Sequence, residues 1–144
     1  MTIPNKNTEN FTTTVTLRNS VDEILAEYAN MPSEQIRSVT LDNVVVSTRA
    51  HDLYLPADII TELGLTLAEE FEVETKTGIK TVRIFKDLYL TLQGRDTACR
   101  CIELPKGKSA ILDQTTLLAL GLKFDVNNQQ LIEVMERTGL IVEC

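Results

Sequence analysis

The sequence is short of basic residues, of long apolar runs, of histidine and of cysteine, and each shortage excludes a class of protein. Its 14 lysines and arginines stand against 21 aspartates and glutamates, which gives a net charge of −7. The largest basic grouping is only Lys106 with Lys108. Because nucleic-acid binding requires clustered Lys and Arg to neutralise phosphates, we expect no nucleic-acid partner.

No stretch of the chain approaches the roughly 20 consecutive apolar residues that a helix needs to span a bilayer. The first residues, MTIPNKNTENF, also lack the charged segment followed by an apolar segment that marks a secretory signal. We therefore expect a cytoplasmic protein without a membrane partner.

Histidine and cysteine are too sparse for a typical metal site. The sequence has one histidine, His51, and three cysteines, Cys99, Cys101 and Cys144, with no C-x-x-C pair. Cys99 and Cys101 are two residues apart, so on a strand their side chains share a face but are poorly placed to bond to each other. We expect buried free thiols, no metal and no cofactor.

The composition that remains is that of an ordinary globular protein, with 43% hydrophobic and 24% charged residues. A chain of 144 residues is long enough to bury one substantial core. We expect residues 1–10, which are polar, to be a flexible N-terminus, and residues 11–144 to form a single domain.

Alternating and β-branched segments predict a mostly β protein. Hairpin turns are expected at 75–78, at 93–96 and at Asn127–Asn128. The apolar run Val44–Val46 ends one strand and is expected to be buried on both faces. Strands are predicted over 11–17, 38–46, 53–55, 71–74, 81–85, 88–92, 97–104, 110–112, 122–126, 130–134 and 140–142.

The first of three predicted helices covers residues 21–29. Ser20 followed by Glu23 is a capping-box pattern, and apolar residues at helical spacing predict a face that covers one end of the sheet. This helix is expected to end before Pro32.

The other two helices belong to a weak internal repeat, ADIITELGL at 57–65 and QTTLLALGL at 114–122. Pro56 suits the first position of one helix, and Asp113 is the expected N-cap of the other, over 115–120. Gly64 and Gly121 are expected to end them. Many short strands, few helices and an internal duplication favour a small closed β architecture with pseudo-twofold symmetry.

The order of these elements resembles the retropepsin-like aspartic proteases, and is most similar to their soluble bacterial members. The resemblance covers residues 12–136. It depends on an apolar strand, a turn, LYLP and a helix ending in Leu-Gly-Leu, then a flap-like hairpin at Val73–Val82, then a second apolar strand, turn, helix and Leu-Gly-Leu with Asp125 shortly after. It implies an acid-protease fold, which is a closed β-barrel with a flap hairpin and two or three short helices, assembled as a homodimer.

Two departures from the family pattern fall in its active-site turn. The family reads V-D-T-G-A, and this chain reads Val46-Ser47-Thr48-Arg49-Ala50, with Ser47 in place of the catalytic aspartate and Arg49 in place of glycine. The second signature, Ile111-Leu112-Asp113, lacks its glycine as well. Two adjacent carboxylates that share a proton activate water in these enzymes, and a serine hydroxyl cannot do so near neutral pH. We therefore predict no catalytic residue in the degenerate turn Ser47, Thr48, Arg49.

Other residues near the turn have structural interpretations. Asp52 is expected to be a solvated or turn-bonding carboxylate, and Asp113 an N-cap that forms an ion pair with Arg49. Ser47 with His51 would suggest a serine hydrolase, but neither a G-x-S-x-G elbow nor a third triad member is visible.

The leading interpretation is a pseudo-protease that acts as a dimeric peptide-binding or regulatory module. An extended peptide would add as a strand in the cleft between the turn and the flap. The residues expected to bind it are Thr48, Arg49, Ala50, Asp52, Thr77, Gly78, Ile79 and Asp113.

Two alternatives remain open at this point. The chain could be an active aspartic-type peptidase that acts through non-standard residues or with a partner. It could also be a structural assembly subunit whose apolar segment at 140–142 pairs with another subunit.

Overall fold

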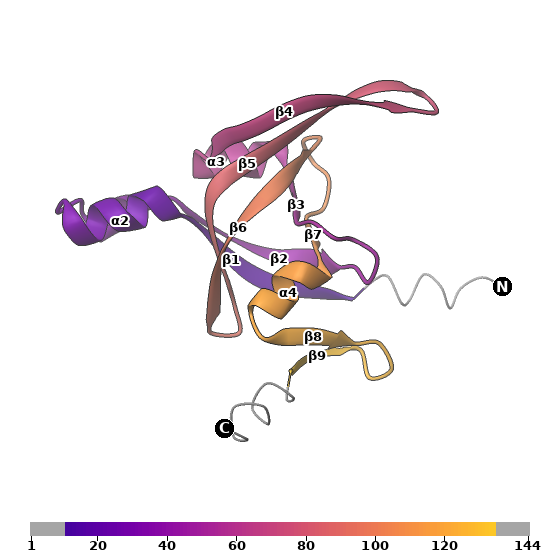
Figure 1. The fold of residues 1–144 in the computed structure, drawn as a ribbon. Helices are drawn as coiled ribbons and strands as arrows, with labels where there is room; N and C mark the ends of the chain where they lie inside the picture. Colours follow the sequence, from indigo (N-terminus) through magenta and orange to yellow (C-terminus); the bar gives the residue numbers. More distant parts are fainter. Residues whose placement is uncertain (1–10, 135–144) are drawn as a thin grey trace, which may run out of the picture.

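A computed structural model of the chain describes residues 11–134 as a mostly β fold built on a ring of six strands (Figure 1). Pairing of β1 (Thr12–Asn19) with both β2 (Ser38–Val46) and β5 (Gly78–Leu92) closes the ring, and β4 (Thr66–Thr75) is added at the free edge of β5. The mostly β prediction is confirmed. The ring runs in the order β1, β2, β7 (Ile111–Leu112), β3 (Tyr54–Pro56), β6 (Arg95–Leu104) and β5.

Strand β5 is the longest element and bends from the ring into a projecting hairpin. The prediction of two strands, 81–85 and 88–92, is wrong because the chain does not stop between them. It forms a bulge between Phe85 and Leu88, where Asp87 has a φ of 70°. A bulge bends a strand without ending it, and in sequence it looks like a break in the alternation. The first part of β5 pairs with β4 and the last part with β6 and β1.

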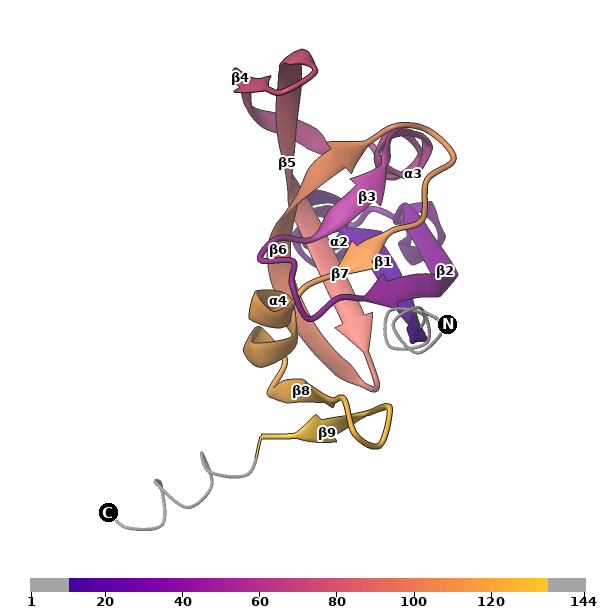
Figure 2. The same ribbon diagram turned by 90° about the vertical axis from the view of Figure 1, so that its right-hand side faces the viewer.

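Two parallel pairings bring distant segments together. β2 pairs in parallel with β7, so that Val46 lies beside Leu112, and β3 pairs in parallel with β6. β7 and β3 meet at one antiparallel pair, Ile111 with Tyr54. Figure 2 looks onto the side where β2, β7, β3, β6 and β5 follow one another. The end of β2 therefore lies next to the residues that open the second repeat.

The core fills the inside of the ring. Val44 and Val46 are almost completely buried, whereas Val45 between them is only half-buried on the outer face. The prediction that this run is buried on both faces is wrong because only the inner face is covered. The largest fully buried side chains are Val15, Leu17, Val44, Val46, Leu55, Leu63, Leu88, Leu90, Leu92, Leu112, Leu117 and Leu122.

Helix α2 (Ser20–Tyr28) forms where it was predicted but does not cover the sheet. It projects away from the ring (Figure 1). Its N-cap is Asn19, one residue before the predicted one, and Asp22 is its buried residue. A short 3₁₀ helix, η1 (Ser33–Gln35), follows α2. The large apolar residues of α2 are 41–77% exposed, namely Val21, Ile24, Leu25 and Tyr28.

Polar contacts attach the base of α2 to the ring. The Asn19 side chain accepts a hydrogen bond from the Asp22 N–H at 3.0 Å and donates to the carbonyl of Leu63 at 2.9 Å. The Asp22 carboxylate accepts from Arg37 through Nε at 2.8 Å, Nη2 at 2.9 Å and the backbone N–H at 3.0 Å. The Arg37 side chain thereby lowers the pKa of Asp22 below its usual value. This cluster fixes α2 where apolar packing does not.

The two repeat units are both present. Helices α3 (Ala57–Leu63) and α4 (Gln114–Ala119) each follow a short strand and are followed by left-handed glycines, Gly64 at φ 63° and Gly121 at φ 78°. Pro56 is the N-cap of α3 and not its first residue. Asp113 caps α4 as predicted.

The C-terminal part of the described chain is a separate hairpin of β8 (Leu122–Asp125) and β9 (Gln130–Glu133), as predicted. The predicted strand at 140–142 and the N-terminal segment 1–10 lie outside the described residues. Within residues 11–134, no helix has the length and apolar character needed to cross a membrane.

We expect Asp22→Asn to lower the free energy of unfolding by about 1–3 kcal/mol at neutral pH, because the carboxylate that accepts three hydrogen bonds from Arg37 is lost. Since folding lowers the pKa of Asp22, its contribution is present above the unfolded pKa of about 3.9 and is lost as the pH falls through the lower folded value. Urea denaturation at neutral and acidic pH measures this, with the exposed Asp42→Asn as the matched control. Equal stability of Asp22→Asn and wild type at neutral pH would contradict the role given to this cluster.

Candidate functional site

The turn after β2 is attached to the start of α4. Ser47 donates its N–H to the carbonyl of Leu112 at 3.0 Å. Gln114 donates its side-chain amide to the carbonyl of Thr48 at 2.8 Å and its backbone N–H to the carbonyl of Ala50 at 3.5 Å. The turn and the segment Ile111–Asp113 are therefore neighbours in space.

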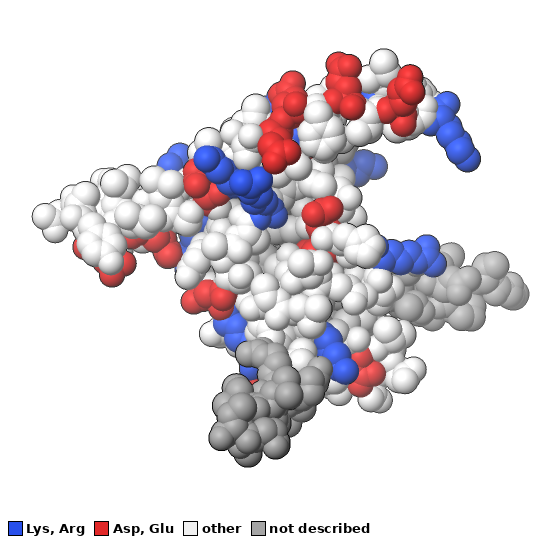
Figure 3. All heavy atoms as spheres, viewed as in Figure 1, with Lys and Arg blue, Asp and Glu red and all other residues white. Residues whose placement is uncertain are grey.

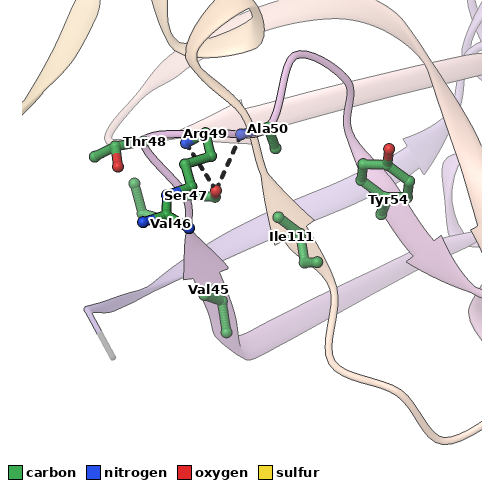
Figure 4. A pocket seen from close by; sticks show the side chains of 8 residues that line it. All are labelled: Val45, Val46, Ser47, Thr48, Arg49, Ala50, Tyr54 and Ile111. Carbon is green, nitrogen blue, oxygen red and sulfur yellow. Dashed lines mark hydrogen bonds between the residues drawn. The ribbon is translucent and has the colours of Figure 1, made fainter. Parts of the chain in front are cut away.

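Ser47 uses its hydroxyl to close the turn. Its Oγ accepts from the N–H of Arg49 and from the N–H of Ala50, each at 3.0 Å (Figure 4). Serine hydroxyls commonly stabilise turns by such bonds to the following backbone. Among the described residues, no hydrogen bond joins His51 to Ser47. The geometry is that of a turn cap and lacks the base that a nucleophilic serine requires.

A pocket of about 410 Å³ opens beside this turn, a volume in the range of small ligand sites. Figure 4 shows the turn on one side, Tyr54 on the other and Ile111 between them. Its lining consists of Val45, Val46, Ser47, Thr48, Arg49, Ala50, Tyr54 and Ile111. Three of the predicted binding residues, Thr48, Arg49 and Ala50, thus lie together.

The other predicted binding residues lie elsewhere. Asp52 lines a second, smaller cavity of about 230 Å³ with Ile84, Arg100, Cys101 and Ile102. Thr77, Gly78 and Ile79 form the end of the β4–β5 hairpin, where the Thr75 hydroxyl donates to the carbonyl of Gly78 at 2.7 Å. None of these residues lines the pocket at Ser47.

An apolar row crosses the outer face of the ring and connects the two cavities. Its members are directly paired from strand to strand, so their side chains share one face. All are half-buried. We call it the outer row, and it consists of Val45, Ile111, Tyr54, Ile102 and Ile84.

Sequence reasoning missed Val45, Tyr54 and Ile111 as site residues. The available signal was the alternation of each strand, since these residues flank ones that are completely buried. The sequence does not show which strands pair, and only the strand pairing places these three side chains together.

The β4–β5 hairpin extends the face of the outer row beyond the ring. By strand alternation, Val82, Phe71 and Val73 continue the face that carries Ile84. The opposite face carries Glu70, Glu72 and Glu74. The space-filling view shows acidic side chains along the upper side of the projecting hairpin and the molecule hollowed beneath it (Figure 3). One side of the hairpin is therefore mainly apolar, although it also carries Glu69 and Lys80, and the other side carries three glutamates.

Asp113 faces the core. Its Oδ2 accepts from the Thr116 N–H at 3.1 Å, and its Oδ1 has no hydrogen-bond partner among the described residues. The predicted ion pair between Asp113 and Arg49 is not among the ion pairs of the described residues. Asp113 is only 1% exposed, whereas Arg49 is exposed on the turn.

Arg49 differs from the other arginines that the structure describes. Each of the other five lies within 4.0 Å of a carboxylate, and no described carboxylate lies that close to Arg49. The five pairs are Arg18–Glu23, Arg37–Asp22, Arg83–Glu103, Arg95–Glu133 and Arg100–Glu69. Arg49 therefore brings an uncompensated positive charge to the edge of the pocket.

The two described cysteines are free thiols, as predicted, and Cys144 lies outside the described residues. Burial raises the pKa of both Cys99 and Cys101 to about 12, and the charge of Asp113 adds to the increase at Cys99. Because the thiolate is the reactive form, neither cysteine is suited to nucleophilic chemistry.

The sequence was compared with known proteins. No protein-family model matches the chain, and a search of curated proteins found no match either.

We expect Cys99 and Cys101 to be unreactive toward a thiol reagent such as Ellman's reagent at neutral pH, because Cys101 is buried, Cys99 is half-buried and both thiols stay protonated. A Cys144→Ser variant isolates these two, and unfolding it in denaturant should make both react. Rapid reaction of either thiol in the folded variant would show that the site around β6 is more open than described.

Proposed function

We propose that this chain is a catalytically inactive relative of the retropepsin-like aspartic proteases that forms a homodimer and binds extended peptide segments. The observation that carries the proposal is the turn at Ser47. A serine that only closes its own turn occupies the position where the family has a catalytic aspartate, at the edge of an apolar pocket.

The arrangement of strands supports the kinship. Two strand–helix–glycine units lie side by side through the parallel pairing of β2 with β7 and the hydrogen bond from Ser47 to Leu112. A projecting hairpin follows the first unit, at the point where the family has its flap. These features depend on non-local pairing of strands, and they are the structural support for the proposed kinship.

The contents of the pocket support the loss of catalysis. None of the eight residues that line it is an aspartate or a glutamate. Asp52 lies in the neighbouring cavity, and Asp113 is held in the core by Thr116. Peptide hydrolysis of the aspartic type requires a carboxylate that can take a proton from water and return it to the leaving amine. The residues at this turn cannot perform that step.

The surface around the pocket supports peptide binding. The outer row and the apolar side of the hairpin form a surface on which an extended segment can lie, and the outer edge of β4 has no strand partner among the described residues. Exposed strand edges bind extended peptides by backbone hydrogen bonds, while side-chain pockets give selectivity.

We expect the wild-type protein to cleave no unfolded protein substrate, and the double variant Ser47→Asp with Arg49→Gly to gain peptidase activity at acidic pH. The double variant restores the V-D-T-G-A frame, and an aspartate oxygen can accept the same two turn N–H groups that Ser47 accepts now. Cleavage of unfolded casein, with and without a transition-state analogue of aspartic proteases, measures this.

The matched control for that experiment is Ser47→Asn with Arg49→Gly, which has the same shape but no carboxylate and should stay inactive. Cleavage by the wild-type protein that disappears in Ser47→Ala would overturn the proposal.

A further inference from the structure

We propose that Arg49 makes the pocket selective for an acidic residue in the bound segment, two positions away from an apolar residue. The inference rests on the peptide-binding function proposed above and adds the chemistry of the ligand. Successive side chains of an extended segment point to opposite sides, so residues two apart face the same surface. The acidic side chain pairs with Arg49, and the apolar one packs on Val45, Tyr54 and Ile111.

The first argument is that Arg49 has no carboxylate partner in the part of the chain that the structure describes, although the protein pairs its other five described arginines. A guanidinium offers five N–H donors in a planar fork that matches a carboxylate. At the edge of this pocket, a carboxylate of the ligand can therefore be the ion-pair partner of Arg49.

The second argument is that the turn has few other donors to offer. The N–H groups of Ser47, Arg49 and Ala50 are already used within the protein. The donors that remain on the turn are the hydroxyls of Ser47 and Thr48, the Thr48 N–H and the Arg49 guanidinium, and only the guanidinium carries a charge. An anion that enters the pocket is therefore recognised chiefly by the Arg49 guanidinium.

The third argument is the local reversal of charge. The chain carries a net charge of −7, yet the pocket lining contains one cation and no acidic residue. Three acids of the hairpin, Glu70, Glu72 and Glu74, point to the face opposite the outer row. The acid on the row's own face, Glu69 beside Ile84, is paired with Arg100. An acidic segment is thus repelled by much of the surface and attracted at this pocket.

In the proposed dimer, an acidic ligand would also reduce the repulsion between the two Arg49 side chains. In the family arrangement the two turns meet across the twofold axis, which would place two Arg49 side chains near each other. Like charges at short range repel, and one carboxylate between them compensates both. Binding should therefore occur with one peptide per dimer, and the acidic peptide should favour the dimer.

The test uses three fluorescent peptides blocked at both ends, each a nine-residue segment with a central isoleucine and, two positions later, glutamate, glutamine or lysine. By fluorescence anisotropy we expect the glutamate peptide to bind about two- to fivefold more tightly than the glutamine peptide, the range for an Arg–carboxylate pair at an exposed arginine. Arg49→Gln should remove this preference. Arg49→Lys should keep only part of it, because lysine lacks the planar fork.

The charge-matched control is Lys123→Gln, which removes one positive charge from β8, outside the pocket lining, and should leave the preference unchanged. Thermal unfolding should be the same for Arg49→Gln and wild type, since the exposed Arg49 side chain has no described ion-pair partner.

Equal affinity of the glutamate and glutamine peptides for wild type would overturn this inference and leave peptide binding standing. If Arg49→Gln still prefers the glutamate peptide, the role of Arg49 is likewise overturned and peptide binding stands. A fourth peptide ends, with a free carboxylate, at a glutamine two positions after the isoleucine. It tests whether the anion that Arg49 binds is the C-terminus of a chain. If this peptide binds more tightly than the glutamate peptide, the ligand is a chain terminus and the proposed acidic side chain is wrong. If no peptide binds at all, the proposed function itself fails.

Discussion

The pairing of β2 with β7 is the interaction on which the rest of the site depends. It places Val46 beside Leu112, and the hydrogen bond from the Ser47 N–H to the Leu112 carbonyl extends it into the turn. Gln114 then holds the carbonyl groups of Thr48 and Ala50. Without this contact the turn would be an ordinary surface loop. With it, two segments more than 60 residues apart form one edge of a pocket, and the turn is held well enough to present Arg49.

Local structure was largely predictable because local chemistry decides it. β2 runs from Ser38 to Val46 as predicted, and Asp113 and Gly121 bound α4 where cap and glycine patterns placed them. The errors came where tertiary context overrides local pattern. Helix α2 has the apolar spacing of a packed helix, but a polar cluster around Asp22 attaches it, and its apolar face stays exposed. The bulge near Asp87 joined two predicted strands into one.

The candidate site, like the fold, was predictable in its local features but not in its non-local contacts. The departures at Ser47 and Arg49 located the turn, because they are visible in the printed sequence against a known frame. Its apolar floor was not predictable, since Tyr54 and Ile111 come together only through a single pair between β3 and β7. The ion pair expected between Arg49 and Asp113 fails for a related reason. The family resemblance implies that the two segments meet, but not that the Asp113 side chain turns into the core and the Arg49 side chain toward solvent.

The proposed dimer places two such turns face to face, and a distance measured between the subunits tests this arrangement. Thr48→Cys in a Cys144→Ser background gives one exposed thiol for a spin label, because Cys101 is buried and Cys99 is a half-buried thiol that stays protonated. Double electron–electron resonance should give one narrow, short distance between the two labels. A label at Glu27 on α2, which projects on the side of the ring away from the turn, should give a longer one. A monomeric protein without dipolar coupling between labels would contradict the proposed dimer. So would a distance between labels at position 48 that is longer than the distance between labels at position 27.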